Sequence, residues 1–361
     1  MSLFIFILLL TALIVVHEFG HFFTAKFFGI KVEEFGIGFP PKLLYIKRGE
    51  TVYSINLLFF GGFVKIFGEN YNEGAGNPRS FASKPRYQQA LVVAAGVIMN
   101  VLFAWLSLTA GYAVGLPSSG TKHGVENLQN VQVMVVGLMP NSPAQKSGLM
   151  PEDVVKEVGT GAQTPTATPS AEALRNFIAQ HQDESIILSI DRKGEEKTFV
   201  VRAEEGLVEG RKALGVHLDD VGILRLPLHL AVIEGAKLTY DMTLATGAGL
   251  GQFFSTIARG TADFSSVAGP IGIAGIGASA VNQGFSAAAV VVALISINLA
   301  IINLLPIPGL DGGRLLIIAI EGILRRPVSP RITMILTILG FTFLIGLMIL
   351  VSFNDITRLI G

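Results

Sequence analysis

Apolar residues occur along this chain in blocks much longer than one period of a helix or a strand. Residues 1–16 carry no charge, and the apolar character resumes at Phe22 and Phe23 after a short polar interruption. Further apolar blocks cover residues 90–116, 287–305 and 332–352. A helix of roughly 20 apolar residues, rising about 1.5 Å per residue, crosses the hydrocarbon core of a bilayer. The pattern therefore predicts a polytopic α-helical membrane protein with four transmembrane helices.

The composition agrees with this prediction. Half of the 361 residues are hydrophobic and only 15% are charged, and the mean hydropathy of +0.57 is higher than that of ordinary soluble domains. A cleaved signal peptide is the alternative for the first block, but a basic leading region and a small-residue cleavage site are both missing. There is no cysteine, which excludes disulfide frameworks, thiolate metal sites and cysteine nucleophiles.

The segments between the blocks differ in character. Residues 117–220 are polar with strand-like runs, which indicates a folded domain outside the hydrocarbon. Residues 227–259 mix apolar positions with Glu234, Lys237 and Asp241, which favours a helix lying on the membrane surface. We therefore expect four parts: residues 1–116 with the first two helices, 117–220 as the polar domain, 221–286 as an interfacial helix and linker, and 287–361 with the last two helices.

The basic residues of the short loops predict the orientation. Lys and Arg are frequent between the first and second helices and between the third and fourth, and such loops stay on the cytoplasmic side. Both termini and the polar domain are then expected outside the cytoplasm. The formal net charge is zero, so the overall balance indicates no nucleic-acid partner.

The first apolar block contains the sequence His17-Glu18-Phe19-Gly20-His21. A spacing of four places both imidazoles on one face of a helix, where they can bind one zinc ion, and Glu18 can act as general base on the attacking water. A charged residue in the middle of a membrane span costs about 2.5–3.5 kcal/mol unless it is paired or bound to a metal. The alternative is a helix end that emerges into water.

A hydrolytic zinc site needs a third protein ligand, and Asp311 is the best candidate. It lies in a segment, residues 303–313, where two prolines and several glycines interrupt the third apolar block. Irregular backbone at membrane depth is tolerated where it is buried in protein or lines a cavity. The alternative is a plain Asp-Gly turn at the membrane surface. The remaining histidines are interpreted as ordinary surface residues: His123, His181, His217 and His229.

The two motifs together, H-E-F-G-H at residues 17–21 and N-L-L-P-I-P-G-L-D-G-G at residues 303–313, resemble the site-2 protease family of intramembrane metalloproteases. The order of the spans resembles the bacterial branch typified by the regulator of sigma-E protease, and the resemblance covers essentially the whole chain. It implies one catalytic Zn²⁺ held by His17, His21 and Asp311, with Glu18 as catalytic base. It also implies that Asn303 binds the substrate.

The second apolar block departs from the family in one place. The family carries Ala-Gly-Pro followed by an asparagine, whereas this chain has Val97 in place of the proline and keeps Gly96 and Asn100. We expect Gly96 to pack closely against the first helix. Asn100 is expected near the site and is included among the candidate substrate-binding residues, although small-residue packing alone is the alternative.

Residues 42–67 predict a membrane-associated β-hairpin region with a turn at Gly49. In the family that the chain resembles, a similar hairpin dips into the membrane and offers an edge strand, to which an extended substrate adds through backbone hydrogen bonds. Gly61, Gly62 and Phe63 are therefore candidate substrate-binding residues. The alternative is a hairpin that only covers the cytoplasmic side.

The polar domain looks like one α+β PDZ-like domain. Its expected strands lie near residues 133–136, 185–191 and 197–202, and its expected helix lies at 171–181. A PDZ groove binds an extended peptide or a chain terminus, and the alternative is a folded spacer. The family implies substrates that are transmembrane proteins already cut by another protease, such as anti-sigma factors or leftover signal peptides, in the bacterial cytoplasmic (inner) membrane.

Two other functions fit parts of this pattern. An ordinary membrane-anchored zincin peptidase also uses H-E-x-x-H, but takes its third ligand from a helix in a water-exposed domain. A non-catalytic membrane adaptor that acts through its PDZ-like domain needs no metal. We favour the intramembrane zinc metalloprotease because both motifs lie in apolar segments.

Overall fold

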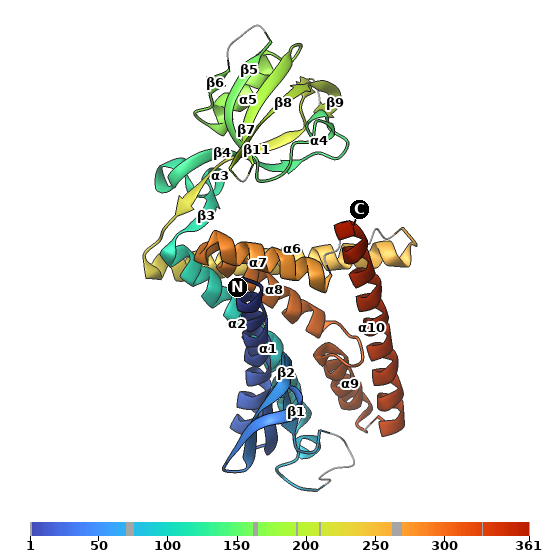
Figure 1. Cartoon of the computed structure of the whole chain (residues 1–361). Coiled ribbons are helices and arrows are strands. Elements are labelled where there is room, and N and C mark those ends of the chain that lie inside the picture. The colour runs from blue at the N-terminus through green and yellow to red at the C-terminus, as the bar shows by residue number, and fades with distance from the viewer. Residues whose placement is uncertain are drawn as a thin grey trace. The chain divides into compact units, whose positions relative to one another are not determined.

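The computed structural model describes residues 2–69, 76–161, 165–192, 194–208, 211–261, 269–326 and 328–360 (Figure 1). The chain forms two compact units. One joins Met1–Ala113 to Pro227–Gly361, and the other consists of Val114–Leu226. The division into four parts by residue range remains a prediction.

Four helices of the described chain are long and apolar enough to cross a membrane, which confirms the predicted number. They are α1 (Ser2–Phe27), α2 (Arg86–Val114), α8 (Phe285–Leu304) and α10 (Pro330–Ile360). Large apolar side chains cover their surfaces, and Phe23, Met334 and Phe341 are each at least 60% exposed. Such a surface is a liability in water but is solvated by lipid. The chain is therefore an integral membrane protein.

The first unit contains further helices, which are α6 (Leu228–Ala258), α7 (Pro270–Gln283), α9 (Asp311–Leu324) and the short 3₁₀ helix η1 (Phe81–Ser83). α6 covers the segment predicted as an interfacial helix. α9 was not predicted. The chain leaves α8 at Leu304, passes through residues 305–310 and enters α9 at Asp311. Pro306 and Pro308 lack the backbone N–H that would continue α8, so the chain turns there.

The β-hairpin region begins earlier than predicted. β1 (Val32–Arg48) and β2 (Thr51–Ile66) are antiparallel and meet at the expected turn, but β1 already begins at Val32. Residues 34–37 have strand partners on both sides, in 52–55 and in 62–65, and Val32 pairs with Ile66. Within the described chain, residues 62–66 have strand partners on one side only and so form an edge. Glycines and the Pro40-Pro41 pair interrupt the alternation in β1, which explains why the pattern did not reveal it.

Glu50 ties the turn of this hairpin to the end of α1. Its carboxylate accepts hydrogen bonds from Lys26 Nζ at 2.7 Å and from Arg79 Nη2 at 2.6 Å. The hydrogen bonds from Lys26 and then Arg79 hold the pKa of Glu50 below its ordinary value. These side chains are partly exposed, so each pair stabilises the fold by at most about 1 kcal/mol. Their effect is mainly to fix the turn beside α1.

The second unit is an α+β domain built on one antiparallel sheet. Its strand order is β3-β11-β4-β5-β7-β8, with β6 paired to β5, and β9 pairs with β10 separately. The elements are β3 (Leu116–Ser119), α3 (Gly120–His123), η2 (Val125–Asn127), β4 (Gln129–Leu138), α4 (Pro143–Lys146), β5 (Val154–Thr160), β6 (Thr166–Ala167), α5 (Ala171–Gln180), β7 (Ser185–Arg192), β8 (Glu195–Arg202), β9 (Glu204–Val208), β10 (Arg211–Ala213) and β11 (Val216–Leu224).

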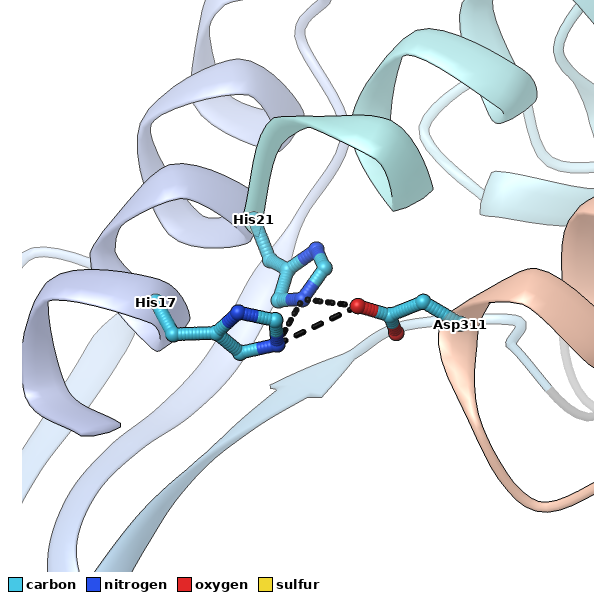
Figure 2. Close-up of side chains that lie close together, drawn as sticks. All are labelled: His17, His21 and Asp311. Carbon is cyan, nitrogen blue, oxygen red and sulfur yellow. Dashed lines mark hydrogen bonds and ion pairs between the residues drawn. The ribbon is translucent and has the colours of Figure 1, made fainter. Parts of the chain in front are cut away.

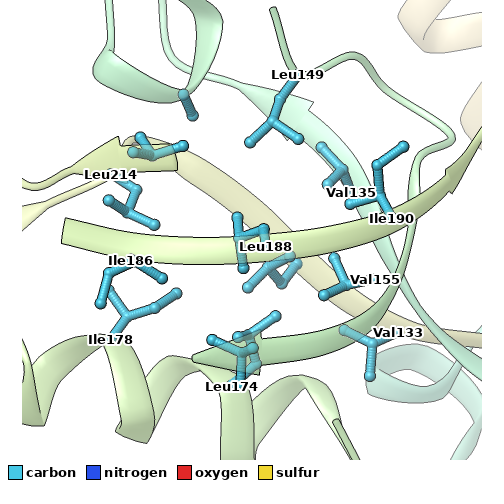
Figure 3. Close-up of a cluster of buried hydrophobic side chains, with 14 of the residues drawn as sticks. Val133, Val135, Leu149, Val155, Leu174, Ile178, Ile186, Leu188, Ile190 and Leu214 are labelled. Atoms are coloured by element: carbon cyan, nitrogen blue, oxygen red, sulfur yellow. The ribbon is translucent and has the colours of Figure 1, made fainter. Parts of the chain in front are cut away.

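The core of this unit forms between the sheet and α5. Val135, Leu174, Ile186 and Leu188 are all at most 2% exposed and belong to one cluster (Figure 3). Alternate residues of β7 enter this core, as the pleat of a half-buried strand requires. The predicted helix and strands are therefore found. The PDZ-like identity of the unit and its location outside the cytoplasm remain predictions.

A buried ion pair closes the turn that leads into β5. The Asp153 side chain is 1% exposed and accepts hydrogen bonds from Arg192 Nε and Nη2, both at 2.7 Å. Arg192 also donates to the Gly148 carbonyl at 2.8 Å, and its guanidinium lies over the Phe199 ring. The Met150 amide also donates to this carboxylate at 2.8 Å. Because the carboxylate is buried, it depends on Arg192 for the positive charge that balances it.

We predict that Arg192→Met destabilises the second unit by roughly 3 kcal/mol, since it leaves a buried carboxylate without its cation. Native-state hydrogen exchange of the β5 and β7 amides in the full-length protein measures this loss. Lys197→Met is the matched control: its ion pair with Glu195 is exposed and should change stability by at most about 0.5 kcal/mol. Equal protection factors in the two variants would contradict the assignment.

Candidate metal centre

Helices α1 and α2 cross with their backbones in close contact. A Cβ added at Gly20 would overlap the carbonyl group of Ala95, and a Cβ added at Gly96 would fall on the imidazole rings of His21 and His17. Small residues at such a crossing let two membrane helices approach closely. The close packing predicted at Gly96 is confirmed, and the histidine rings occupy the space that the glycine leaves.

Three ligand-type atoms from distant parts of the chain converge at this crossing (Figure 2). His17 Nε2 and His21 Nε2 lie 3.2 Å apart, and Asp311 Oδ2 lies 3.1 Å from the first and 3.4 Å from the second. Within the described residues, these three side chains are the one group of His, Asp or Glu positioned to share a metal ion. None of the other histidines belongs to it.

The geometry fits zinc. A tetrahedral site with bonds of about 2.0–2.1 Å separates its ligand atoms by about 3.3–3.4 Å, close to the three distances here. Asp311 Oδ2 is buried, and no described residue gives it a hydrogen bond of regular geometry, a state that a bound cation would relieve. The Asp311 side chain as a whole remains 21% exposed, although its Oδ2 atom is buried.

The outer nitrogens of both rings have partners on α2. His21 Nδ1 lies 2.9 Å from the carbonyl oxygen of Val92, which can only accept. Nδ1 therefore carries a proton, and in the neutral ring Nε2 offers a lone pair. His17 Nδ1 lies 3.2 Å from the side-chain amide of Asn100. A backbone partner such as Val92 has no signature in the sequence, because every residue carries the same carbonyl.

Asp311 is held in place by the start of α9. Residues 305–310 fold back on this helix so tightly that a Cβ at Gly312 or Gly313 would overlap their carbonyl groups. Arg86 at the start of α2 pairs at 2.8 Å with Glu321, whose side chain has no exposed surface. Sequence reasoning missed this pair, although a glutamate within the apolar run of α9 was the available signal.

A second ion pair anchors the same helix. Arg314 donates to the Glu69 carboxylate at 2.5 Å and to the Glu69 carbonyl at 2.8 Å, and its guanidinium lies 4.9 Å from the Phe81 ring. Glu69 directly follows the hairpin region. The aspartate is therefore braced both by α2 and by the segment that follows β2.

Of the remaining predicted site residues, Asn303 and Asn100 contact the cluster, Gly62 lies beside Glu18, and Gly61 and Phe63 contact Phe39. A Cβ at Gly62 would lie 3.6 Å from Glu18 Cγ, so the edge of β2 passes beside the predicted base. Gly61 has a positive φ of 119°, and the Phe63 ring stacks on Phe39. Asn303 Nδ2 lies 3.4 Å from His17 Nε2. The Asn100 side chain is fully buried, and its amide contacts His17.

Comparisons with known proteins agree with this geometry. Residues 5–347 match the model of Peptidase family M50. A Nostoc relative and a Clostridium perfringens relative, both provisionally named zinc metalloproteases, are 34% and 32% identical to the chain; the alignments cover 99% and 97% of this chain and 97% of each relative. The zinc metalloprotease RasP of Oceanobacillus iheyensis is 26% identical, with 98% of each chain covered.

The family match includes both motifs that supply the converging side chains, and the whole-length relatives are zinc metalloproteases by name. An apolar chain that brings two histidines and an aspartate together between membrane helices is the architecture that such an enzyme requires. The chain therefore belongs to peptidase family M50, the site-2 protease family, and is a membrane zinc metalloprotease.

Proposed function

We propose that the chain is an intramembrane endopeptidase that cuts the transmembrane segments of other membrane proteins. One observation carries the proposal: His17 and His21 on the membrane-spanning α1 meet Asp311 with their ligand-type atoms 3.1–3.4 Å apart. Ionisable groups placed so deep in an apolar unit are costly unless they serve a site. In this proposal, these three side chains hold one Zn²⁺.

The ion and the residues around it would have different roles in the reaction. When bound, zinc acts as a Lewis acid that acidifies the attacking water to a pKa of about 7 and polarises the scissile carbonyl. The Glu18 carboxylate takes a proton from that water and passes it to the leaving nitrogen. Glu18 Cγ lies 3.6 Å from where a Cβ at Gly62 would be, and this position beside the edge of β2 supports a place next to an extended substrate.

Asn303 is proposed to bind the substrate backbone. Its amide nitrogen lies 3.4 Å from His17 Nε2, on the cluster itself rather than behind it. An amide N–H can donate to a carbonyl oxygen that gains negative charge during the reaction. In this role Asn303 would orient the scissile bond without holding the metal.

The edge of β2 at residues 61–66 is proposed to receive the substrate. Peptide bonds inside a helix are already hydrogen-bonded, so the target must unwind before it is cut. Adding it as a strand beside residues 62–66, which have partners on one side only among the described residues, would replace the hydrogen bonds that unwinding breaks. Gly61, Gly62 and Phe63 would then lie along the substrate backbone.

The second unit is proposed to act as a PDZ-like domain outside the cytoplasm, where both chain termini would also lie. A cavity of about 270 Å³ between α5 and residues 212–218, with Arg175, Ile178 and Gly215 in its lining, supports a groove for a peptide. Substrates would be membrane proteins already shortened by another protease, such as anti-sigma factors or remnants of signal peptides, in the bacterial cytoplasmic membrane.

Zinc content tests the ligand assignment. We predict about one zinc per chain in detergent-purified wild type and loss of the metal in His21→Ala and Asp311→Ala, because two ligands alone do not hold zinc tightly. Elemental analysis measures it, with His229→Ala, an exposed histidine on α6, as the control that keeps its metal. Zinc retained in Asp311→Ala would favour a zincin with its third ligand elsewhere, and no zinc in the wild type would favour the adaptor.

The role of Glu18 has its own test. Glu18→Gln keeps the shape of the side chain but cannot accept a proton, so we predict a fall in cleavage of a membrane-inserted signal-peptide remnant by roughly 10²–10⁴-fold. Zinc content should stay unchanged. Substantial cleavage by the zinc-loaded variant would remove Glu18 from the mechanism.

Cross-linking tests the edge strand, because the chain has no native cysteine. In the Glu18→Gln background, we predict that Lys65→Cys forms disulfides with cysteines placed along the remnant, strongest at every second position as strand pairing requires. Lys47→Cys changes a lysine that is also exposed but lies on the opposite edge of the hairpin region, and it is the matched control. Similar yields from the two variants would argue against strand addition at residues 62–66.

A further inference from the structure

Asn100 lies behind the metal centre and is fixed from several sides. Its side chain is fully buried, its amide nitrogen lies 3.2 Å from His17 Nδ1, and its backbone carbonyl accepts a hydrogen bond from Ser296 Oγ at 2.8 Å. The contact is with the ring nitrogen that faces away from Asp311. A residue so enclosed acts on the site through His17.

The other end of the same amide lacks a partner. Asn100 Oδ1 is buried, and no described residue donates a hydrogen bond to it. An amide oxygen left in this state costs about 1–3 kcal/mol. The two ends of an amide have nearly the same shape, so a half-turn of the group exchanges them. After that turn, Oδ1 would accept from His17 Nδ1–H, and Nδ2 would take the place that Oδ1 now occupies. The end without a partner therefore does not choose between the two orientations, and the choice depends on the proton of His17.

The proton on His17 decides which end of the amide must face it. A neutral imidazole carries a proton on one nitrogen and a lone pair on the other. If Asn100 donated to Nδ1, the proton would sit on Nε2, the atom that lies 3.1 Å from Asp311 Oδ2 and 3.2 Å from His21 Nε2, and Nε2 could not bind a metal. If Asn100 accepts from Nδ1–H, the Nε2 lone pair is free.

His21 also has a hydrogen-bond partner on α2 at its Nδ1 atom, and this partner cannot exchange the roles of donor and acceptor. The Val92 carbonyl at 2.9 Å from His21 Nδ1 can only accept. Val92, Gly96 and Asn100 follow one another at intervals of four, so they lie on one face of α2. That face presents the Val92 carbonyl to His21, the Asn100 amide to His17, and a glycine between them that leaves space for both rings.

We propose that Asn100 is a positioning residue whose side-chain oxygen holds His17 in the tautomer with the proton on Nδ1, so that Nε2 can bind zinc. The inference rests on the proposed role of His17 as a zinc ligand. Partners of this kind orient the ring and raise its basicity, and their loss typically lowers metal affinity by about 10–100-fold.

Two substitutions at this position separate the proposal from a purely structural role. Asn100→Leu has a similar size but neither accepts nor donates. Asn100→Asp offers a carboxylate that accepts from Nδ1–H and cannot donate in its ionised form. The apo form of Asn100→Asp buries an additional charge and should be the less stable variant, so a zinc affinity that merely followed stability would be weakest there.

The experiment measures zinc affinity by chelator competition on full-length protein in detergent, with thermal unfolding of the zinc-free forms in parallel. We expect affinity about 10–100-fold lower in Asn100→Leu and unchanged or tighter in Asn100→Asp. Ser296→Ala, which removes the hydroxyl bonded to the Asn100 backbone, is the packing control and should bind zinc as the wild type does.

Other results would overturn the proposal. Wild-type affinity in Asn100→Leu would show that no acceptor is needed. Equal losses in Asn100→Leu and Asn100→Asp would mean that the amide serves packing or donates to Nδ1. His17→Ala distinguishes a failure of the proposal about Asn100 from a failure of the proposed zinc site. If that variant bound zinc as tightly as the wild type, the proposed ligand set would be wrong, and this inference would fall with it.

Discussion

The candidate metal centre depends on the close contact of α1 and α2 at two glycines. Between membrane helices, apolar side chains gain little from leaving lipid, so association relies on close packing of backbones and on buried polar contacts. Gly20 and Gly96 permit that approach, and the rings of His17 and His21 lie where a Cβ at position 96 would be. The same contact brings the Val92 carbonyl and Asn100 against the outer nitrogens of the rings. The crossing therefore sets the position of both rings and the partners of their outer nitrogens.

Asp311 reaches the site through an irregular segment that protein atoms must enclose. Residues 305–310 pack on Gly312 and Gly313, and a Cβ at Gly340 of α10 would overlap the carbonyl of Pro308. The ion pairs of Glu321 with Arg86 and of Arg314 with Glu69 then fix α9 against two other elements. Buried ion pairs add little net stability but define one arrangement over others. Here that arrangement decides where the aspartate lies relative to the histidines.

Under the proposed function, chemistry and selection of the target reside in different units. An edge strand binds backbone and makes few demands on sequence, so residues 62–66 beside Glu18 would accept many unwound segments. The choice of substrate would then depend on which proteins reach that edge. The groove beside α5 in the second unit is the candidate site for this selection. Such a protease would bind the substrate backbone at its active site and recognise side chains or chain ends in the second unit. It could then act on varied membrane remnants without cutting every helix nearby.

The sequence alone determined the number of membrane helices, the absence of thiol chemistry and the candidate residues His17, Glu18, His21 and Asp311. Long apolar runs and spacings within one helix are local properties, so they can be recognised in the sequence without knowledge of the fold. Only the tertiary structure decided that Asp311 meets the histidines, that residues 34–37 form the middle of the hairpin sheet, and that Asn100 contacts His17. These facts join residues far apart in the chain, and the backbone carbonyl of Val92 carries no signature in any sequence. Distances between helices arise from packing, which only the folded chain specifies.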